Sequence, residues 1–268
     1  MSCGPVICSY LYCRFHYPPL NTTAFLFVAI SIILFHLSVN TISEYRDCLK
    51  GVDDGNINGP QYRLVAWPSI KPIYILRLGL TSFSLAVFSG FIAVFTASIL
   101  LLIPGLIGAS IALFYSEWPI GYKYKAMGEV GVFLAYGPLL VCSCVFALTN
   151  QFCWRDILMS IPFGLLTMCV VLANNIRDLD FDRGKTRTLP SVIGLRMSYT
   201  LLFSAVHLSF AIVLFLICID AITGMSSLSL LSYPIIFASI KTLNSPKFVD
   251  VFGAIQAVFC ALLALGLL

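Results

Sequence analysis

Two polar clusters interrupt a chain that is otherwise strongly apolar. The first lies in residues 40–51, NTISEYRDCLKG, and the second in residues 174–185, NNIRDLDFDRGK. In each, an asparagine is followed at helical spacing by two acids: Asn40, Glu44 and Asp47, then Asn174, Asp178 and Asp182. Spacings of three and four residues place side chains on one face of a helix. We therefore expect each cluster to present one amide and two carboxylates together. Asp180 does not follow this spacing and is left out of the second cluster.

Carboxylate and amide oxygens are hard ligands suited to Mg²⁺, which usually takes one or two carboxylates together with substrate phosphates. Two such clusters that face each other would hold a diphosphate between metal ions. Basic side chains would neutralise the remaining charge. The candidates for contact with phosphate oxygens are Arg177, Arg183, Lys185, Lys123 and Lys50, together with Tyr115. Solvated helix ends with ion pairs are the ordinary alternative, which the repetition of the same order in two clusters makes less favourable.

The composition predicts the elements that must position these residues. The chain has 268 residues, of which 59% are hydrophobic and only 10% charged, whereas a soluble domain has about 25% charged residues. We therefore expect an all-α polytopic membrane protein in a single domain, since a backbone in lipid must satisfy its own hydrogen bonds. About eight spans are predicted, at residues 23–42, 73–94, 96–115, 128–148, 156–174, 197–219, 222–241 and 248–268. The ten cysteines are mostly in apolar runs and are expected to be buried thiols.

The basic residues fall on one side of this predicted arrangement. The loops at 43–72, 115–127, 175–196 and 241–247, with Arg77, carry fourteen of the sixteen lysines and arginines. The positive-inside rule assigns that side to the cytoplasm. Ten of the twelve carboxylates lie there too. We therefore expect an integral protein of the cell membrane with its active site at the cytoplasmic side.

Several residues inside the predicted spans have a less specific meaning. Glu129, at the membrane end of the fourth span, is a candidate for acid–base chemistry or orientation on the acceptor side, with helix capping or an ion pair to Lys123 or Lys125 as the alternative. His36 and His207 are expected to be satisfied core histidines rather than ligands, and Gly108 and Gly164 to be helix-packing positions. Phe133, Tyr136 and Phe210 are expected to face lipid or the core, with shielding of a carbocation as the alternative for these aromatic rings.

The second cluster, NNIRDLDFDRGKTRTL followed by Gly194, resembles the motif NNxRDxxxDxxxGKxTL of the UbiA superfamily of membrane prenyltransferases. Three further stretches are similar to the MenA branch, the 1,4-dihydroxy-2-naphthoate prenyltransferases. They are EYRDCLKGVD at 44–53, NGP at 58–60 and GYKYKAMGEVGVFLAYGPL at 121–139. The resemblance runs from about residue 25 to the end of the chain.

The chain departs from the family pattern at specific positions. Ser43 and Glu44 stand where the branch usually has Asn-Asp, and Glu129 stands where it has the Asp of a Gly-Asp pair. The family has nine transmembrane helices. Here we expect its first helix to be missing or reduced to residues 6–13, VICSYLYC.

The resemblance implies Mg²⁺-dependent transfer of a polyprenyl group from a prenyl diphosphate to an aromatic acceptor in menaquinone-type quinone biosynthesis, with 1,4-dihydroxy-2-naphthoate as the expected acceptor. The implied metal ligands are Asn40, Glu44, Asp47, Asn174, Asp178 and Asp182, and the catalytic set is Asp47, Asp178, Asp182 and Glu129. The lipid bilayer is the other expected partner. We expect no nucleic acid and no obligate protein partner.

Three alternative functions would require different features of the sequence. Another enzyme of the same superfamily, acting on glyceryl phosphate, homogentisate or haem, would share the metal site and differ on the acceptor side. A cation-coupled transporter would carry its acids nearer to the middle of the membrane. A CDP-alcohol phosphotransferase would need a DGxxAR motif, which the sequence lacks.

Overall fold

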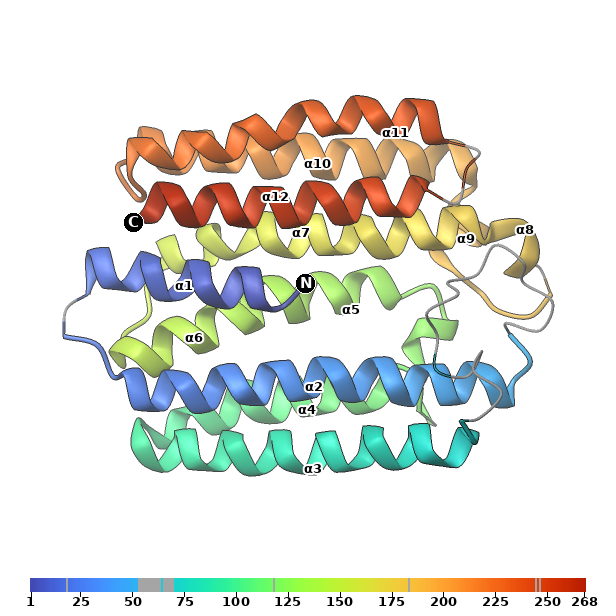
Figure 1. Ribbon diagram of the computed structural model, residues 1–268, viewed down its shortest axis with the longest axis horizontal. Helices are drawn as coiled ribbons and strands as arrows, with labels where there is room; N and C mark the ends of the chain where they lie inside the picture. The colour runs from blue at the N-terminus through green and yellow to red at the C-terminus, as the bar shows by residue number, and fades with distance from the viewer. Residues whose placement is uncertain are drawn as a thin grey trace.

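The chain is almost entirely helical, as Figure 1 shows. The computed structural model describes residues 1–17, 19–52, 64, 70–117, 119–182, 184–243, 245 and 247–268. The elements are α1 (Cys3–His16), α2 (Thr22–Leu49), α3 (Pro72–Thr96), η2 (Ile99–Leu101), α4 (Leu102–Phe114), η3 (Tyr122–Tyr124), α5 (Gly128–Leu134), η4 (Ala135–Leu139), α6 (Leu140–Thr149), α7 (Trp154–Arg177), α8 (Leu179–Asp182), α9 (Leu189–Ile193), α10 (Leu195–Cys218), η5 (Gly224–Ile235), α11 (Ile236–Thr242) and α12 (Phe248–Leu267). The predicted all-α fold is confirmed.

The predicted spans correspond to these helices, although two of them differ in form. Within the described ranges, six helical segments are long and apolar enough to cross a bilayer. The expected span 96–115 consists of the short helices η2 and α4, and the span 222–241 consists of η5 followed by α11. In η5, the hydroxyls of Ser229 and Ser232 each donate to a carbonyl three residues back. Such three-residue bonding suits a 3₁₀ helix and competes with α-helical geometry.

Residues 3–16, of which only 6–13 were expected to be helical, form α1. Its 14 residues extend about 21 Å, which is less than the roughly 30 Å of a hydrocarbon core. The helix begins midway along the bundle and ends at the face opposite the predicted basic loops (Figure 1). The buried Tyr12 hydroxyl donates to Oδ1 of Asp156 at 3.1 Å, which attaches α1 to the start of α7.

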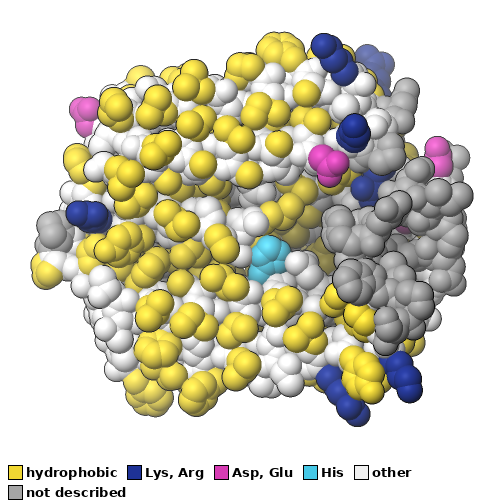
Figure 2. Space-filling view, viewed as in Figure 1, with side chains coloured by type: hydrophobic (Ala, Val, Ile, Leu, Met, Phe, Trp, Pro, Cys, Tyr) yellow, Lys and Arg dark blue, Asp and Glu magenta, His cyan; other side chains and the backbone are white. Residues whose placement is uncertain are grey.

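One end of the bundle gathers the loops that carry most of the charge. The ends of α2, α4, α7 and α11 meet there with the starts of α3, α5, α10 and α12 (Figure 1). Figure 2 shows lysines and arginines mostly toward this end, while apolar side chains cover most of the rest of that face. Successive spans therefore run in the alternating directions that the sequence predicts.

Helix α7 is the central element of the bundle. It is the most buried of the candidate spans, and it packs against α5, α6, α10 and α12. Its contact with the π-helical turn η4 is unusually close, since a Cβ added to Gly137 would lie 3.0 Å from the Cα of Gly164. The second polar cluster is thus carried by the helix with the most packing partners.

Candidate active site

The carboxylate of Asp47 is the centre of the first cluster. It is 4% exposed and lies on α2, where Nζ of Lys123 approaches its Oδ2 to 2.5 Å. The hydroxyl of Tyr124 donates to its Oδ1 at 2.8 Å, and Lys123 also donates to the hydroxyl of Ser43 at 2.8 Å. Burial and the charge of Asp47 raise the pKa of the Tyr124 phenol well above its usual value, so this phenol remains a donor.

The other predicted members of the first cluster lie before and after Asp47 along α2 and its C-terminal cap. Glu44 is half-buried, and Asn40 borders the cavity described below. Lys50 is exposed, with its Nζ 3.3 Å from the centre of the Tyr124 ring, a cation–π contact. The α2 helix is continuous from Asn40 through Asp47, as the three- and four-residue spacing predicts, and Lys50 caps its end.

The second cluster spans the end of α7 rather than its interior. Asp178 caps α7, and the short helix α8 continues to Asp182. The amide of Asp178 donates to the carbonyl of Asn174 at 3.0 Å, and the amide of Asp182 donates to the carbonyl of Asp178 at 2.8 Å. These bonds keep the four-residue repeat across the break, so the predicted spacing survives although one helix does not run through it.

Arg177 holds the second cluster in shape. Its Nε and Nη2 donate to the two carboxylate oxygens of Asp178 at 2.8 and 2.7 Å, a bidentate pair. The same Nη2 donates to Oδ1 of Asn174 at 2.8 Å. In this arrangement the guanidinium of Arg177 neutralises the buried carboxylate of Asp178, which is 7% exposed.

The acids of the second cluster differ in burial, and the difference follows the spacing. Asp182 is 8% exposed, like Asp178, whereas Asp180 is exposed. Nζ of Lys185 donates to the carbonyl of Val52 at 3.3 Å, which joins the segment after the second cluster to the segment after the first. The predicted phosphate contact Arg183 lies outside the described residues.

Glu129 lies at the start of α5 and is 1% exposed. Its Oε1 accepts from Nδ2 of Asn175 at 2.8 Å, so it connects α5 to α7 beside Asn174. The alternative ion pair with Lys123 is not formed, because Lys123 pairs with Asp47.

Sequence reasoning missed three contacts of this region. Tyr124 is the partner of Asp47, Asn175 is the partner of Glu129, and Glu117 forms an ion pair with Arg46. The available signal was adjacency, since Tyr124 follows Lys123 and Asn175 follows Asn174. Adjacency alone does not select a partner from a distant segment.

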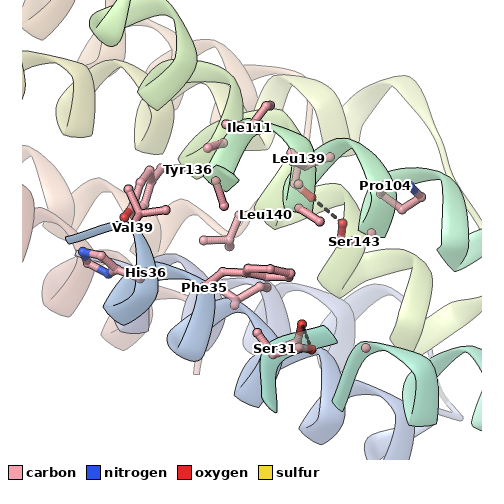
Figure 3. A pocket seen from close by; sticks show the side chains of 18 of the residues that line it. Ser31, Phe35, His36, Val39, Pro104, Ile111, Tyr136, Leu139, Leu140 and Ser143 are labelled. Carbon is pink, nitrogen blue, oxygen red and sulfur yellow. Dashed lines mark hydrogen bonds between the residues drawn. The ribbon is translucent and has the colours of Figure 1, made fainter. Parts of the chain in front are cut away.

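An apolar cavity of about 410 Å³ opens beside the first cluster. Asn40, Tyr115 and Tyr122 line it near the charged end, and Val28, Val94 and Leu101 line it farther along the bundle. Figure 3 shows side chains of α2 facing those of α4, η4 and α6 across it. Thr167 and Val171 of α7 also line it, and Val171 is one turn before Asn174.

Residues that the sequence assigned to packing or lipid divide into two groups. His36, Gly108 and Tyr136 line the cavity. Phe210 is buried against Phe259, and Phe133 packs on the core, as expected of core residues. Gly164 packs against η4, as predicted. His207 is exposed on α10, so the prediction that it is a core histidine is wrong.

The donor chemistry of the two clusters fits a hard divalent cation. Among the described residues, no group of three or more acidic, histidine or cysteine side chains is placed to hold a metal alone. Each cluster does bring together buried carboxylate oxygens, an asparagine and basic side chains at the same end of the bundle. Mg²⁺ needs only one or two carboxylates when phosphates supply the other ligands. This terminal position also differs from the mid-membrane acids that a transporter would use.

The sequence matches the model of the UbiA prenyltransferase family over residues 2–247. The chain belongs to the UbiA prenyltransferase family. Within it, the chain is 30% identical over 212 residues to 1,4-dihydroxy-2-naphthoate octaprenyltransferase of Bacillus subtilis, which covers 79% of this chain and 67% of that protein. It is 26% identical over 233 residues to UbiA prenyltransferase domain-containing protein 1 of Xenopus tropicalis, covering 85% and 66% of the two chains. The resemblance to the MenA-like branch of the UbiA family is thereby confirmed.

Solved UbiA structures share this fold. The UbiA homolog of Aeropyrum pernix K1 superposes with a TM-score of 0.71 at 13% identity, covering 98% of this chain and 94% of that one. A UbiA homolog of Archaeoglobus fulgidus bound to DMAPP and Mg²⁺ gives 0.65 at 16% identity, covering 99% and 94%. The chain is also 30% identical over 159 residues to 1,4-dihydroxy-2-naphthoate octaprenyltransferase of Mycobacterium tuberculosis, and this match covers 59% of this chain and 53% of that protein. The matched parts therefore span about half to two thirds of the length of these curated relatives.

Proposed function

We propose that this protein transfers a polyprenyl group from a prenyl diphosphate to an aromatic acceptor of the dihydroxynaphthoate class, with Mg²⁺ as cofactor. The single observation that carries the proposal is that two clusters, each with an asparagine and at least one buried carboxylate, lie at the same end of the bundle, one of them at the border of an apolar cavity. A diphosphate bound at the clusters can extend an apolar chain into that cavity. Membership of the UbiA prenyltransferase family and similarity to naphthoate octaprenyltransferases support the substrate class.

The chain's own residues bind and orient the diphosphate. Asn40, Glu44 and Asp47 from one side, and Asn174, Asp178 and Asp182 from the other, would hold magnesium, which supplies positive charge that neutralises the leaving group. Lys123 and Arg177 already neutralise Asp47 and Asp178. If those carboxylates held magnesium, these two cations would be available to phosphate oxygens, with Lys185, Lys50, Tyr115 and Arg183 as further candidates.

The reaction breaks the allylic C–O bond, and the electron pair leaves with the diphosphate. The acceptor ring carbon that bears the carboxylate forms the new C–C bond to the allylic carbon. The carboxylate then leaves as carbon dioxide, and the electron pair of the broken C–C bond returns to the ring. Tyr115, Tyr122 and Tyr136 line the cavity near the first cluster and exclude water from the allylic carbon. Glu129 supports the acceptor side through Asn175, which it holds beside Asn174.

The same proposal includes the place of the reaction. Apolar helices support an integral membrane protein, and an isoprenoid product can leave from between them into lipid. The basic loops at the cluster end favour the cytoplasmic side of the cell membrane.

The test is an assay of purified protein in detergent with Mg²⁺, geranylgeranyl diphosphate and 1,4-dihydroxy-2-naphthoate, followed by mass spectrometry of the extracted lipids. We expect a prenylated, decarboxylated naphthalene product that disappears when the metal is chelated. Homogentisate and geranylgeranylglyceryl phosphate are the parallel acceptors. Product formation with one of these and none with the naphthoate would overturn the acceptor class.

A further inference from the structure

His36 extends the polar face of α2 into the cavity. It precedes Asn40 by four residues, so it lies one helical turn, about 6 Å, deeper along the face that carries Asn40, Glu44 and Asp47. Figure 3 shows its ring beside Val39 and close to Tyr136. A diphosphate held by the two clusters would therefore have its reacting carbon toward this histidine rather than away from it.

One edge of the His36 ring is already used and the other is open. Its Nδ1 lies 2.8 Å from the hydroxyl of Ser2, and this is its one hydrogen bond within the described ranges. No hydrogen-bond partner of its Nε2 occurs among the described residues, and this atom is not fully buried, in contrast to Nε2 of His16. Since His36 lines the cavity, its Nε2 edge is accessible to a molecule that enters there.

Tyr136 brings a second polar group to the same place. Its ring is 5.2 Å from that of His36 at an interplanar angle of 85°. It comes from the π-helical turn η4, a distortion of the kind that often accompanies functional sites. Its hydroxyl makes no hydrogen bond in the part of the chain that the structure describes, and it is not fully buried, so a bound molecule can reach it.

The serine and threonine hydroxyls that line the cavity are occupied. Ser31 donates to the carbonyl of Ala86, Ser143 to that of Leu139, and Thr167 to that of Phe163. An isoprenoid chain has no polar atom that could satisfy His36 or Tyr136. A bound molecule with a hydroxyl on an aromatic ring has both the polar atom and the flat apolar body that such a site accommodates.

We propose that His36 and Tyr136 bind the ring hydroxyl of the aromatic acceptor and thereby select hydroxylated arenes as the second substrate. This inference rests on the proposed function and adds the residues that recognise the acceptor. A neutral imidazole has one donor and one acceptor nitrogen, and Ser2 can serve either tautomer. The open nitrogen can therefore accept from, or donate to, an aryl hydroxyl, while the Tyr136 phenol makes the complementary bond.

The direct test measures binding in the absence of prenyl diphosphate. The fluorescent probes are 4-hydroxy-2-naphthoate and 2-naphthoate, which differ by the ring hydroxyl alone. We expect wild-type protein to bind the hydroxylated probe about three- to tenfold more tightly, the range that one or two hydrogen bonds provide. His36→Ala should remove this preference. The matched control is His207→Ala, because His207 lies on α10 with its Nδ1 at the carbonyl of Phe203 and should leave the preference unchanged.

Kinetics give a second readout. Tyr136→Phe removes one oxygen atom and keeps the ring, so it tests the site even if His36→Ala does not fold. We expect it to raise the KM for the acceptor about three- to tenfold while the KM for the prenyl diphosphate stays within a factor of two. His36→Gln, which retains a donor and an acceptor, should restore part of the preference.

The two proposals can fail separately. If wild-type protein prenylates no aromatic acceptor, the proposed function is wrong. If wild-type protein is active but the His36→Ala and Tyr136→Phe variants keep the full preference for 4-hydroxy-2-naphthoate, the inference is wrong and the function stands.

Discussion

At the scale of single residues, burial distinguishes acids that the sequence places side by side. Asp178 and Asp182 are 7% and 8% exposed, and Asp180 between them is exposed. A buried carboxylate is costly unless it is paired. Asp178 meets that cost through the bidentate contact with Arg177. A buried carboxylate such as that of Asp178 in a membrane protein is therefore expected to have a function.

The pair Asp178→Asn and Asp180→Asn tests this distinction. We expect Asp178→Asn to lower turnover about 100-fold or more, since roughly 3 kcal/mol of lost transition-state stabilisation has that effect. Asp180→Asn should retain nearly wild-type turnover because its side chain faces outward. The measurement is product formation under saturating Mg²⁺, with the thermal midpoint of each variant as a check of folding. Equal turnover in the two variants would contradict the assignment.

At the scale of elements, the central helix α7 positions both the second cluster and the wall of the cavity. Its Gly164 allows α5 and η4 to approach so closely that an added Cβ would lie 2.6 Å from the carbonyl oxygen of Phe133 on α5 and 3.1 Å from the Cα of Gly137 on η4. This approach holds the π-helical turn and its Tyr136 against α7. The glycine is therefore required for close packing at the base of the site.

We expect Gly164→Ala to destabilise the protein by about 1–3 kcal/mol, because the backbone of α5 cannot move away easily. Gly253→Ala on α12 is the matched control, since nothing lies within 4 Å of its added Cβ. A glycine replaced by alanine in an open helical position should gain about 0.5–1 kcal/mol instead. Thermal unfolding in detergent gives both values. A Gly164→Ala variant as stable as the Gly253→Ala variant would rule out the tight contact.

At the scale of the whole molecule, the charged end and the apolar cavity together define a directional site. The residues that line the cavity run from Asn40 to Val28 on α2, a distance of about 18 Å along the helix. A prenyl chain attached to a diphosphate at the clusters must follow this path. The length of the cavity should therefore limit the substrates that the protein accepts.

A larger side chain in the part of the cavity far from the two clusters should limit the protein to prenyl diphosphates with shorter chains. Gly105 on α4 lines the cavity, and nothing lies within 4 Å of its added Cβ, so Gly105→Phe places a ring into open space. We expect this variant to lose about tenfold or more in kcat/KM for geranylgeranyl diphosphate relative to geranyl diphosphate, which corresponds to about 1.4 kcal/mol. Ile107→Phe is the control, because Ile107 is on the same helix and 48% exposed. The same selectivity in both variants would place the chain elsewhere.

Much of this molecule follows from local rules that the sequence by itself determines. The apolar runs predict helices, because a backbone in lipid has to bond within its own segment. The distribution of lysines and arginines predicts which helix ends share a face, and the structure confirms that shared end. The three- and four-residue spacing predicts the two clusters, and their hydrogen bonds follow that spacing even where α7 stops.

Only the tertiary structure decided which side chains from distant segments meet. The contact of Asp47 with Tyr124 joins residues 77 positions apart, and the rings of His36 and Tyr136 come from helices that no spacing relates. His36 looked like a core histidine in sequence because an apolar run does not show which of its faces borders a cavity. Periodicity is a property of one helix, whereas a binding site depends on how the surface of one helix packs against the next.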